Sequence, residues 1–165
     1  MKTVPRLYTQ RCTLTKIIES DLPYLHQVLF DGESIRFLPE LYDVAKTADG
    51  LKQIIISFNT YLSQDEGILW GIRLDDNLIG FIAVMDLSVE PTIFYAIHSN
   101  YRRLGYMTEC VHKVIDFLFE RDICDYIQTE VYIDNKASLK LLFKNGFEIV
   151  DKGNEKYFLR KNNPI

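Results

Sequence analysis

Two short segments carry residues whose types and spacing suggest chemistry. The first, residues 96–109, has the pattern of a strand, a polar turn with Arg102, Arg103 and Gly105, and the start of a helix. A helix N-terminus exposes unpaired amides and the positive end of the helix dipole, and a glycine lets a bound group approach the backbone closely. The segment therefore fits a pyrophosphate-binding turn, although a glycine that simply begins a helix would have the same pattern.

The second segment, residues 131–147, has the pattern of a strand end followed by a helix. Asn135 stands at the junction and is a preferred helix N-cap, and Ser138 lies one turn further on. Gly146 fits the left-handed residue that ends a helix. Each segment alone is compatible with a structural role. Both follow strands, one helix and one strand apart, and this combination favours a shared site.

Composition limits the class of protein. The chain has 165 residues, 47% hydrophobic and 13% aromatic, which predicts one domain over residues 1–165 with a sizeable core. A formal net charge of −4 without a dense Lys/Arg run argues against nucleic-acid binding. Three cysteines without a CxxC pair argue against a disulfide framework or a metal site. No segment fits a signal peptide or a membrane span, so we expect a cytoplasmic protein without a membrane partner.

Periodicity predicts the elements that must position the two segments. The predicted order is β-α-α-β-β-β-α-β-α-β-β, with a short first helix capped by Ser20 or Asp21 and an irregular stretch over residues 32–46. The other predicted elements are an extended start at 6–19, helices at 49–64, 105–121 and 135–145, strands at 67–74, 78–86, 92–99 and 126–133, and a final hairpin that turns at residues 152–154.

The two segments together resemble the GNAT superfamily of N-acetyltransferases. Arg102 and Gly105 match the Arg/Gln and the central glycine of its motif A, R/Q-x-x-G-x-G/A, and Asn135 matches the hallmark asparagine of motif B, which closes here with Gly146 and Phe147. The N-terminal half is similar to the Rim-type branch, the RimJ/RimL-like ribosomal-protein N-terminal acetyltransferases. The resemblance covers roughly residues 6–160. It implies an α/β GNAT fold with a mixed, mostly antiparallel central sheet flanked by about four helices.

Three positions depart from the family pattern. Met107 stands where motif A usually ends in Gly or Ala, a change that the Rim-type branch tolerates. Arg103 replaces a frequent glycine, so its side chain must point away from the phosphates or grip them. Leu142 stands where many GNAT enzymes have a tyrosine general acid, and in the Rim-type branch a serine at the place of Ser138 is the usual candidate instead.

The resemblance implies acetyl-CoA as the acyl donor and no metal, and homodimers are common among similar proteins. Pantetheine is expected to pair with the strand edge at residues 95–97, and the amides of Ile97 and His98 are the expected oxyanion donors. The residues predicted to bind acetyl-CoA are Tyr95, Ala96, Ile97, His98, Arg102, Arg103, Leu104, Gly105, Tyr106, Met107, Asn135 and Ser138.

Acyl transfer to an amine also needs a route for the ammonium proton, and it benefits from a proton donor to the leaving thiolate. Glu130, which alternates with Gln128 and Tyr132 onto one face of a strand, is the predicted carboxylate base. A solvated or salt-bridged glutamate is an equal alternative. Ser138 is the predicted acid, with Tyr132 as its rival.

These features predict an N-acetyltransferase that moves an acetyl group from acetyl-CoA to a primary amine by direct attack in a ternary complex. The amine is a protein N-terminus or a small molecule. Two alternatives stay open: a non-catalytic acyl-CoA-binding or sensor module, which Leu142 would suit, and an aminoglycoside or polyamine acetyltransferase, which an acidic cleft would favour. The short turn at residues 152–154 predicts an open acceptor site that suits a peptide end.

Overall fold

One mixed sheet organises the chain. The structure is a computed structural model that describes residues 1–164; Ile165, part of the expected domain, lies outside the described residues. The strands are β1 (Leu7–Tyr8), β2 (Thr13–Lys16), β3 (Gly67–Leu74), β4 (Asn77–Met85), β5 (Thr92–Ile97), β6 (Tyr126–Tyr132), β7 (Glu148–Lys152) and β8 (Lys156–Asn162). The helices are α1 (Leu22–Leu29), α2 (Gly32–Phe37), α3 (Pro39–Ala45), α4 (Gly50–Ser63), α5 (Tyr106–Glu120) and α6 (Lys136–Lys144).

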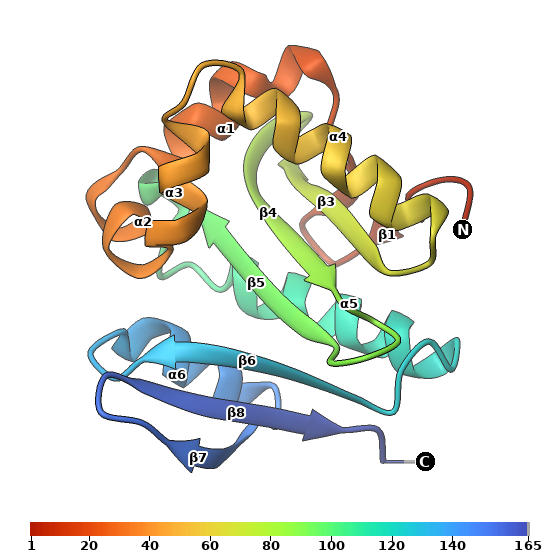
Figure 1. The fold of residues 1–165 in the computed structure, drawn as a ribbon, viewed down its shortest axis with the longest axis vertical. Helices are drawn as coiled ribbons and strands as arrows, with labels where there is room; N and C mark the ends of the chain where they lie inside the picture. Colours follow the sequence, from red (N-terminus) through yellow and green to blue (C-terminus); the bar gives the residue numbers. More distant parts are fainter. Residues whose placement is uncertain (165) are drawn as a thin grey trace.

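The strands lie in the order β1-β2-β3-β4-β5-β6-β8-β7, and every neighbouring pair is antiparallel except β5 and β6 (Figure 1). The predicted mixed, mostly antiparallel sheet is therefore confirmed. No helix in the described part of the chain is long and apolar enough to cross a membrane.

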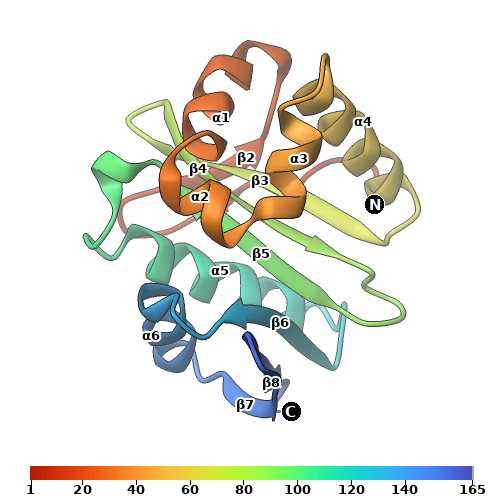
Figure 2. The same ribbon diagram turned by 60° about the vertical axis from the view of Figure 1, so that its left-hand side comes forward.

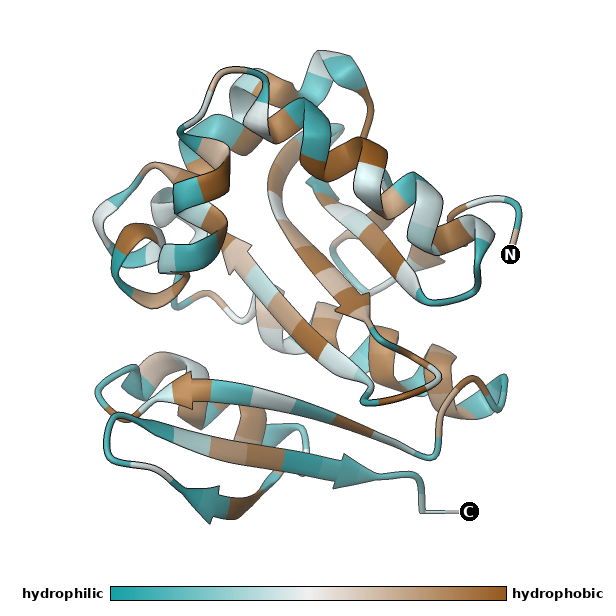
Figure 3. Ribbon diagram, viewed as in Figure 1, coloured by the Kyte–Doolittle hydropathy of each residue, from teal (hydrophilic) through white to brown (hydrophobic). Residues whose placement is uncertain are grey.

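Helices cover both faces of the sheet, α1–α4 on one face and α5 and α6 on the other (Figures 1 and 2). Because side chains alternate along a strand, β3 sends Trp70 to the α5 side and Leu69 to the α4 side. The strands β3 and β4 are apolar along most of their length (Figure 3), which fits burial from both sides. Trp70 is fully buried, and its ring nitrogen donates to the carbonyl of Pro5 at 2.8 Å.

Most of residues 32–46 is helical, in α2 and α3, so the prediction of an irregular stretch is wrong. The structure has six α-helices within residues 1–164 rather than about four. The Asp31 carboxylate caps α2 by accepting from the Ser34 amide at 3.0 Å. Leu38 precedes a proline and leaves helical geometry, and Pro39 then begins α3 at its first position. Two helices too short to show an apolar period replace the expected loop.

The extended start also differs from its prediction, because it forms the two strands β1 and β2 joined by a turn. The expected cap of α1 is right in position, because Asp21 is the N-cap residue, but not in its hydrogen bond. Asp21 precedes the helix but makes no side-chain cap bond. Its carboxylate instead accepts from the Ile18 amide at 2.8 Å and from Arg73 at 2.9 and 2.7 Å. The Asp21 carboxylate, which the sequence predicts to cap α1, is thus bound by Arg73, a residue distant in the chain.

The parallel pair β5–β6 holds together only at its beginning. Its one recorded bridge joins Thr92 to Gln128, and the Gln128 amide donates to the Pro91 carbonyl at 2.8 Å. Beyond that point the two strands diverge (Figure 1). The edges of β5 and β6 that face each other therefore lie open along the rest of both strands.

The Asp21–Arg73 pair predicts a pH-dependent contribution to stability. Burial opposes ionisation of Asp21, but hydrogen bonds from Arg73 and the Ile18 amide outweigh it, so the pKa of Asp21 is lowered. The stabilisation is therefore present above the ordinary carboxyl pKa of about 4 and is lost as the pH falls through the lowered value. We expect Asp21→Asn to reduce the free energy of unfolding by about 2 kcal/mol at pH 7.

Urea unfolding of both proteins between neutral and acid pH would measure this difference, which should shrink on acidification. The control is Asp43→Asn, which breaks the exposed pair of Asp43 with Lys46 and should cost less than about 0.5 kcal/mol. Equal losses from the two substitutions would contradict a structural role for the Asp21–Arg73 pair.

Candidate active site

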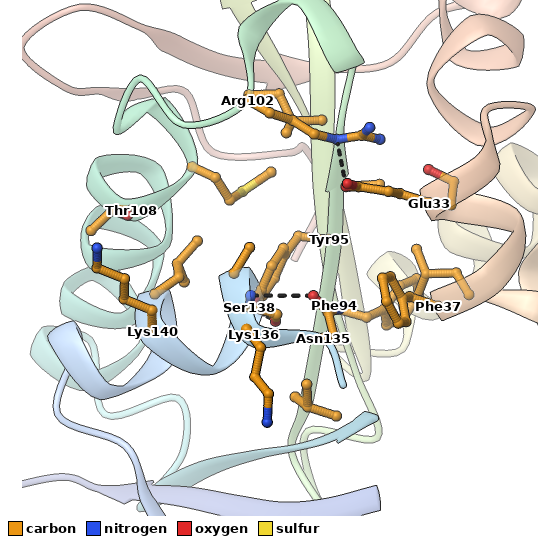
Figure 4. A pocket seen from close by; sticks show the side chains of 18 of the residues that line it. Glu33, Phe37, Phe94, Tyr95, Arg102, Thr108, Asn135, Lys136, Ser138 and Lys140 are labelled. Atoms are coloured by element: carbon orange, nitrogen blue, oxygen red, sulfur yellow. Dashed lines mark hydrogen bonds and ion pairs between the residues drawn. The ribbon is translucent and has the colours of Figure 1, made fainter. Parts of the chain in front are cut away.

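A pocket of about 610 Å³ lies where β5 and β6 diverge. Its walls come from both faces of the sheet, because α5 and α6 line one part and α2 lines another. Figure 4 shows Thr108 and Lys140 on one side of this space and Glu33 and Phe37 on the other. Of the predicted site residues, the pocket brings together Tyr95, Ala96, Ile97, Arg102, Arg103, Gly105, Tyr106, Met107, Glu130, Tyr132, Asn135 and Ser138. His98 and Leu104 do not line it.

The start of α5 presents backbone amides to the pocket. Gly105 is the N-cap residue of α5 and has φ 85°, a left-handed conformation that favours glycine. The first amides of α5 have no partner within the helix by geometry. Tyr106, Met107 and Thr108 carry these amides and line the pocket. A negatively charged group fits this position because the helix dipole is positive there.

The two arginines of the turn differ in what they contact. Arg102 is bound to two carboxylates of the α2 start, at 2.6 Å from Asp31 and 3.1 Å from Glu33. Burial opposes ionisation of Asp31, but the bond and the charge of Arg102 and the bonds from backbone amides at the start of α2 together outweigh it, so the pKa of Asp31 is lowered. Arg103 is exposed at the pocket, has φ 63°, and has no ion-pair partner among residues 1–164. The sequence predicts that both arginines add charge to the turn, and the structure shows that the charge of Arg102 is paired with carboxylates whereas that of Arg103 is not, within the described residues.

Arg11, which the sequence patterns did not single out, holds the turn from the N-terminal side. Its guanidinium donates to the carbonyl of Leu104 at 2.9 Å and to the Glu109 carboxylate at 2.6 Å. It also stacks on the ring of Tyr106, 4.2 Å from its centre. Leu104 thus contributes its carbonyl to this support and not a side chain to the pocket. Nothing local marks Arg11, because its partners lie more than ninety residues away.

The start of α6 forms the neighbouring wall. The Asn135 side chain accepts from the Ser138 amide at 3.3 Å, which confirms the predicted N-cap (Figure 4). The Ser138 hydroxyl lies 2.5 Å from the hydroxyl of Tyr95. Three further pocket residues, Lys136, Lys140 and Lys144, are spaced by four along the helix and share one face. This spacing is visible in the sequence and would have indicated a cationic wall.

The backbone of β5 decides which amides face the opening. The His98 amide donates to the Ile79 carbonyl of β4 at 2.7 Å, so it is not available as an oxyanion donor and that prediction is wrong. Backbone groups alternate in direction along a strand. The amides of Ala96 and His98 therefore point to β4, and those of Tyr95 and Ile97 point toward the diverging edge of β6.

The remaining wall is aromatic and belongs to the α2 side. Phe37 of α2 lies with its ring centre 6.2 Å from that of Tyr132, and Phe94 of β5 lines the same pocket. Glu130 is half exposed and lies 3.4 Å from Lys156, so it forms the salt bridge that was its alternative role. The prediction of an open acceptor site rested on the short β7–β8 turn and overlooked α2, which contributes part of this wall.

Comparison with known proteins identifies the family. Residues 11–148 match the family model described as the acetyltransferase (GNAT) domain. The chain belongs to the GNAT acetyltransferase family. It is 28% identical over 152 residues to the uncharacterized N-acetyltransferase YoaA of Bacillus subtilis, which covers 87% of this chain and 83% of that protein.

Solved GNAT structures share the fold. RimL, an alpha-N-protein acetyltransferase of a ribosomal protein solved with coenzyme A, superposes with a TM-score of 0.83 at 13% identity, covering 96% of this chain and 98% of RimL. The ribosomal-protein-S5-alanine acetyltransferase of Vibrio fischeri gives a TM-score of 0.83 at 17% identity, covering 97% of each chain. These two likenesses show that the chain shares the fold of both proteins. The acetyltransferase class of the chain rests on the family match over residues 11–148.

The pocket carries groups of the kind that fit a pyrophosphate. The α5 amides, the exposed Arg103 and the α6 lysines all line it, and Gly105 leaves the backbone uncovered. Leu142, at the position of the frequent tyrosine acid, is fully buried and takes no part. No group of three or more His, Cys, Asp or Glu side chains in residues 1–164 is placed to hold a metal ion.

Gly105→Ala tests the turn directly. An added Cβ would lie 3.1 Å from Arg11 Nη2, on a backbone with φ 85°. We expect acetyl-CoA to bind at least about tenfold more weakly, because the turn must change shape to relieve this strain. Isothermal titration calorimetry measures the affinity.

Gly32→Ala is the matched control, since an added Cβ there has no heavy atom within 4 Å. It should leave the affinity for acetyl-CoA within about twofold. Unchanged affinity in Gly105→Ala would mean that the ligand does not approach this backbone.

Proposed function

We propose that the protein transfers an acetyl group from acetyl-CoA to the N-terminal amine of a polypeptide, by direct attack in a ternary complex. The observation that carries this proposal is the course of the pocket. It opens between the diverging β5 and β6 and is lined from both faces of the sheet. Two ligands that enter from opposite faces meet there, so no covalent enzyme intermediate is required.

The donor side uses backbone amides and cations. The amides at the start of α5 and the side chain of Arg103 hold the pyrophosphate, and the lysines of α6 offer charge to the remaining phosphate. The Tyr95 and Ile97 amides lie on the open edge of β5, where they bind the donor's amide chain and stabilise an oxyanion on the thioester carbonyl. Asn135 contributes by fixing the start of α6.

The residues that the sequence suggests as base and acid act on the amine and on the leaving sulfur. Glu130 lies at the pocket and accepts the ammonium proton of the acceptor, directly or through water. Its contact with Lys156 at 3.4 Å is long enough for another cation to compete. Ser138 serves the leaving sulfur, because it lines the pocket where Leu142 does not. Tyr132 contributes to the aromatic wall.

The acceptor wall favours a peptide end over a polycation. Its two carboxylates, Glu33 and Glu130, already lie beside Arg102 and Lys156, so the wall is not the acidic surface that an aminoglycoside or polyamine would require. Phe37, Leu38 and Phe94 instead offer apolar contact. We therefore propose a first residue with an apolar side chain. The two solved structures described above are of ribosomal-protein acetyltransferases, which agrees with this class of acceptor.

A thermal-shift comparison of acetyl-CoA, CoA and ATP comes first, followed by mass spectrometry of a peptide panel. A ligand at 100 times its dissociation constant stabilises the fold by about 2.7 kcal/mol. Both CoA species should shift the unfolding midpoint, ATP should not, and peptides with an apolar first residue should be acetylated at their N-termini. Acetylation of polyamines in preference to every peptide would overturn the acceptor proposal.

Glu130→Gln tests the proton route. It should lower kcat/KM for the peptide about 100-fold at pH 7. The loss should diminish at high pH, where the amine is already neutral and needs no base. Glu148→Gln on the exposed strand β7 is the control and should change nothing. A loss that is constant over the pH range would remove Glu130 from the proton route.

A further inference from the structure

Tyr95 carries a hydroxyl that the proposed function does not use. Its side chain leaves β5 on the α6 side of the sheet, and the phenol oxygen lies 2.5 Å from Ser138 Oγ. No other hydrogen bond of this phenol is recorded among residues 1–164. Burial raises the pKa of Tyr95, so the phenol keeps its proton throughout the neutral and alkaline range.

The direction of this hydrogen bond follows from the two groups. A buried phenol needs an acceptor, and the hydroxyl of Ser138 is the acceptor within reach. A serine hydroxyl both accepts and donates, so it keeps its own proton when the phenol donates to it. That proton is then free for a partner in the pocket, which Ser138 lines.

We propose that Tyr95 is a positioning residue that turns the Ser138 hydroxyl toward the sulfur of the acyl donor. This inference rests on the proposed function. The phenol donates to Ser138 Oγ, and Ser138 donates a hydrogen bond to the sulfur as negative charge grows on it. No proton leaves either hydroxyl, so the thiolate departs as an anion. Hydrogen bonds in such a chain strengthen one another, which makes Ser138 a better donor than an isolated serine.

The backbone around Ser138 supports this role. The Asn135 cap fixes the Ser138 amide at 3.3 Å, so the side chain starts from a defined position. The ring of Tyr95 packs against the core and fixes its hydroxyl from the other side. Asn135, Ser138 and Tyr95 converge on one wall of the pocket in Figure 4.

A double-mutant cycle measures the coupling. Tyr95→Phe keeps the ring and removes the hydroxyl, and we expect kcat to fall about tenfold with acetyl-CoA affinity within about twofold. Ser138→Ala should lower kcat about 100-fold, and the double variant should fall no further than Ser138→Ala alone. Tyr126→Phe, outside the pocket, is the control. Multiplied losses in the double variant would contradict the proposal, because the two hydroxyls would then act independently.

A second readout does not depend on turnover. A hydrogen bond to the thiolate lowers the pKa of the bound CoA thiol. This pKa is measured from the absorbance of the thiolate over a range of pH, with the protein alone as the blank at each pH. This pKa should be higher in Tyr95→Phe and in Ser138→Ala than in the unaltered protein. A ring-fluorinated tyrosine at the same position, a stronger donor of similar size, should lower it and avoids the risk of a folding defect.

The outcomes separate the two proposals. CoA that does not bind the unaltered protein would overturn the proposed function. If CoA binds equally to every variant and the pKa of its thiol is unchanged, the role of Tyr95 is overturned. The proposed function is then unaffected.

Discussion

The single bridge between β5 and β6 is the constraint on which the site depends. A parallel pair that continued to pair would bury its facing amides in a ladder and close the sheet. Here pairing ends after Thr92 and Gln128, which leaves the edge of β5 open at Tyr95 and Ile97. The two strands keep their places although they do not pair further with each other. Each is hydrogen-bonded along its full length to its other neighbour, β5 to β4 and β6 to β8.

The opening explains why two kinds of surface meet in one pocket. The α5 side is built from helix amides and cations, as an anionic donor requires, and the α2 side is aromatic with paired carboxylates. Arg103 is exposed on the α5 side and has no ion-pair partner within residues 1–164. Arg102 is bound to Asp31, so it adds no unpaired charge to either surface. Two adjacent residues of one turn thus differ, since Arg102 is bound to a carboxylate of the fold and Arg103 is exposed and unpaired in the described part of the chain.

The helix α2 is anchored on both sides of the opening. Asp31 and Glu33 contact Arg102 on the β5–α5 turn, and Arg36 pairs with Asp134 on the β6–α6 turn. The Asp31–Arg102 pair is partly buried and is the stronger tie, whereas the exposed Arg36–Asp134 pair contributes little. The acceptor wall and the donor turn are therefore one connected structure, and a change in either reaches the other through Arg102.

The sequence by itself determined what depends on neighbours in the chain. The strand and helix periods, the Asn135 cap and the left-handed Gly146 are local, so their physical causes are visible without a fold. Only the tertiary structure decided the partners of Arg102, the support from Arg11, the engaged amide of His98 and the contact between Tyr95 and Ser138. Each of these joins residues far apart in the chain, and the direction in which the strands diverge, not local spacing, brings them together.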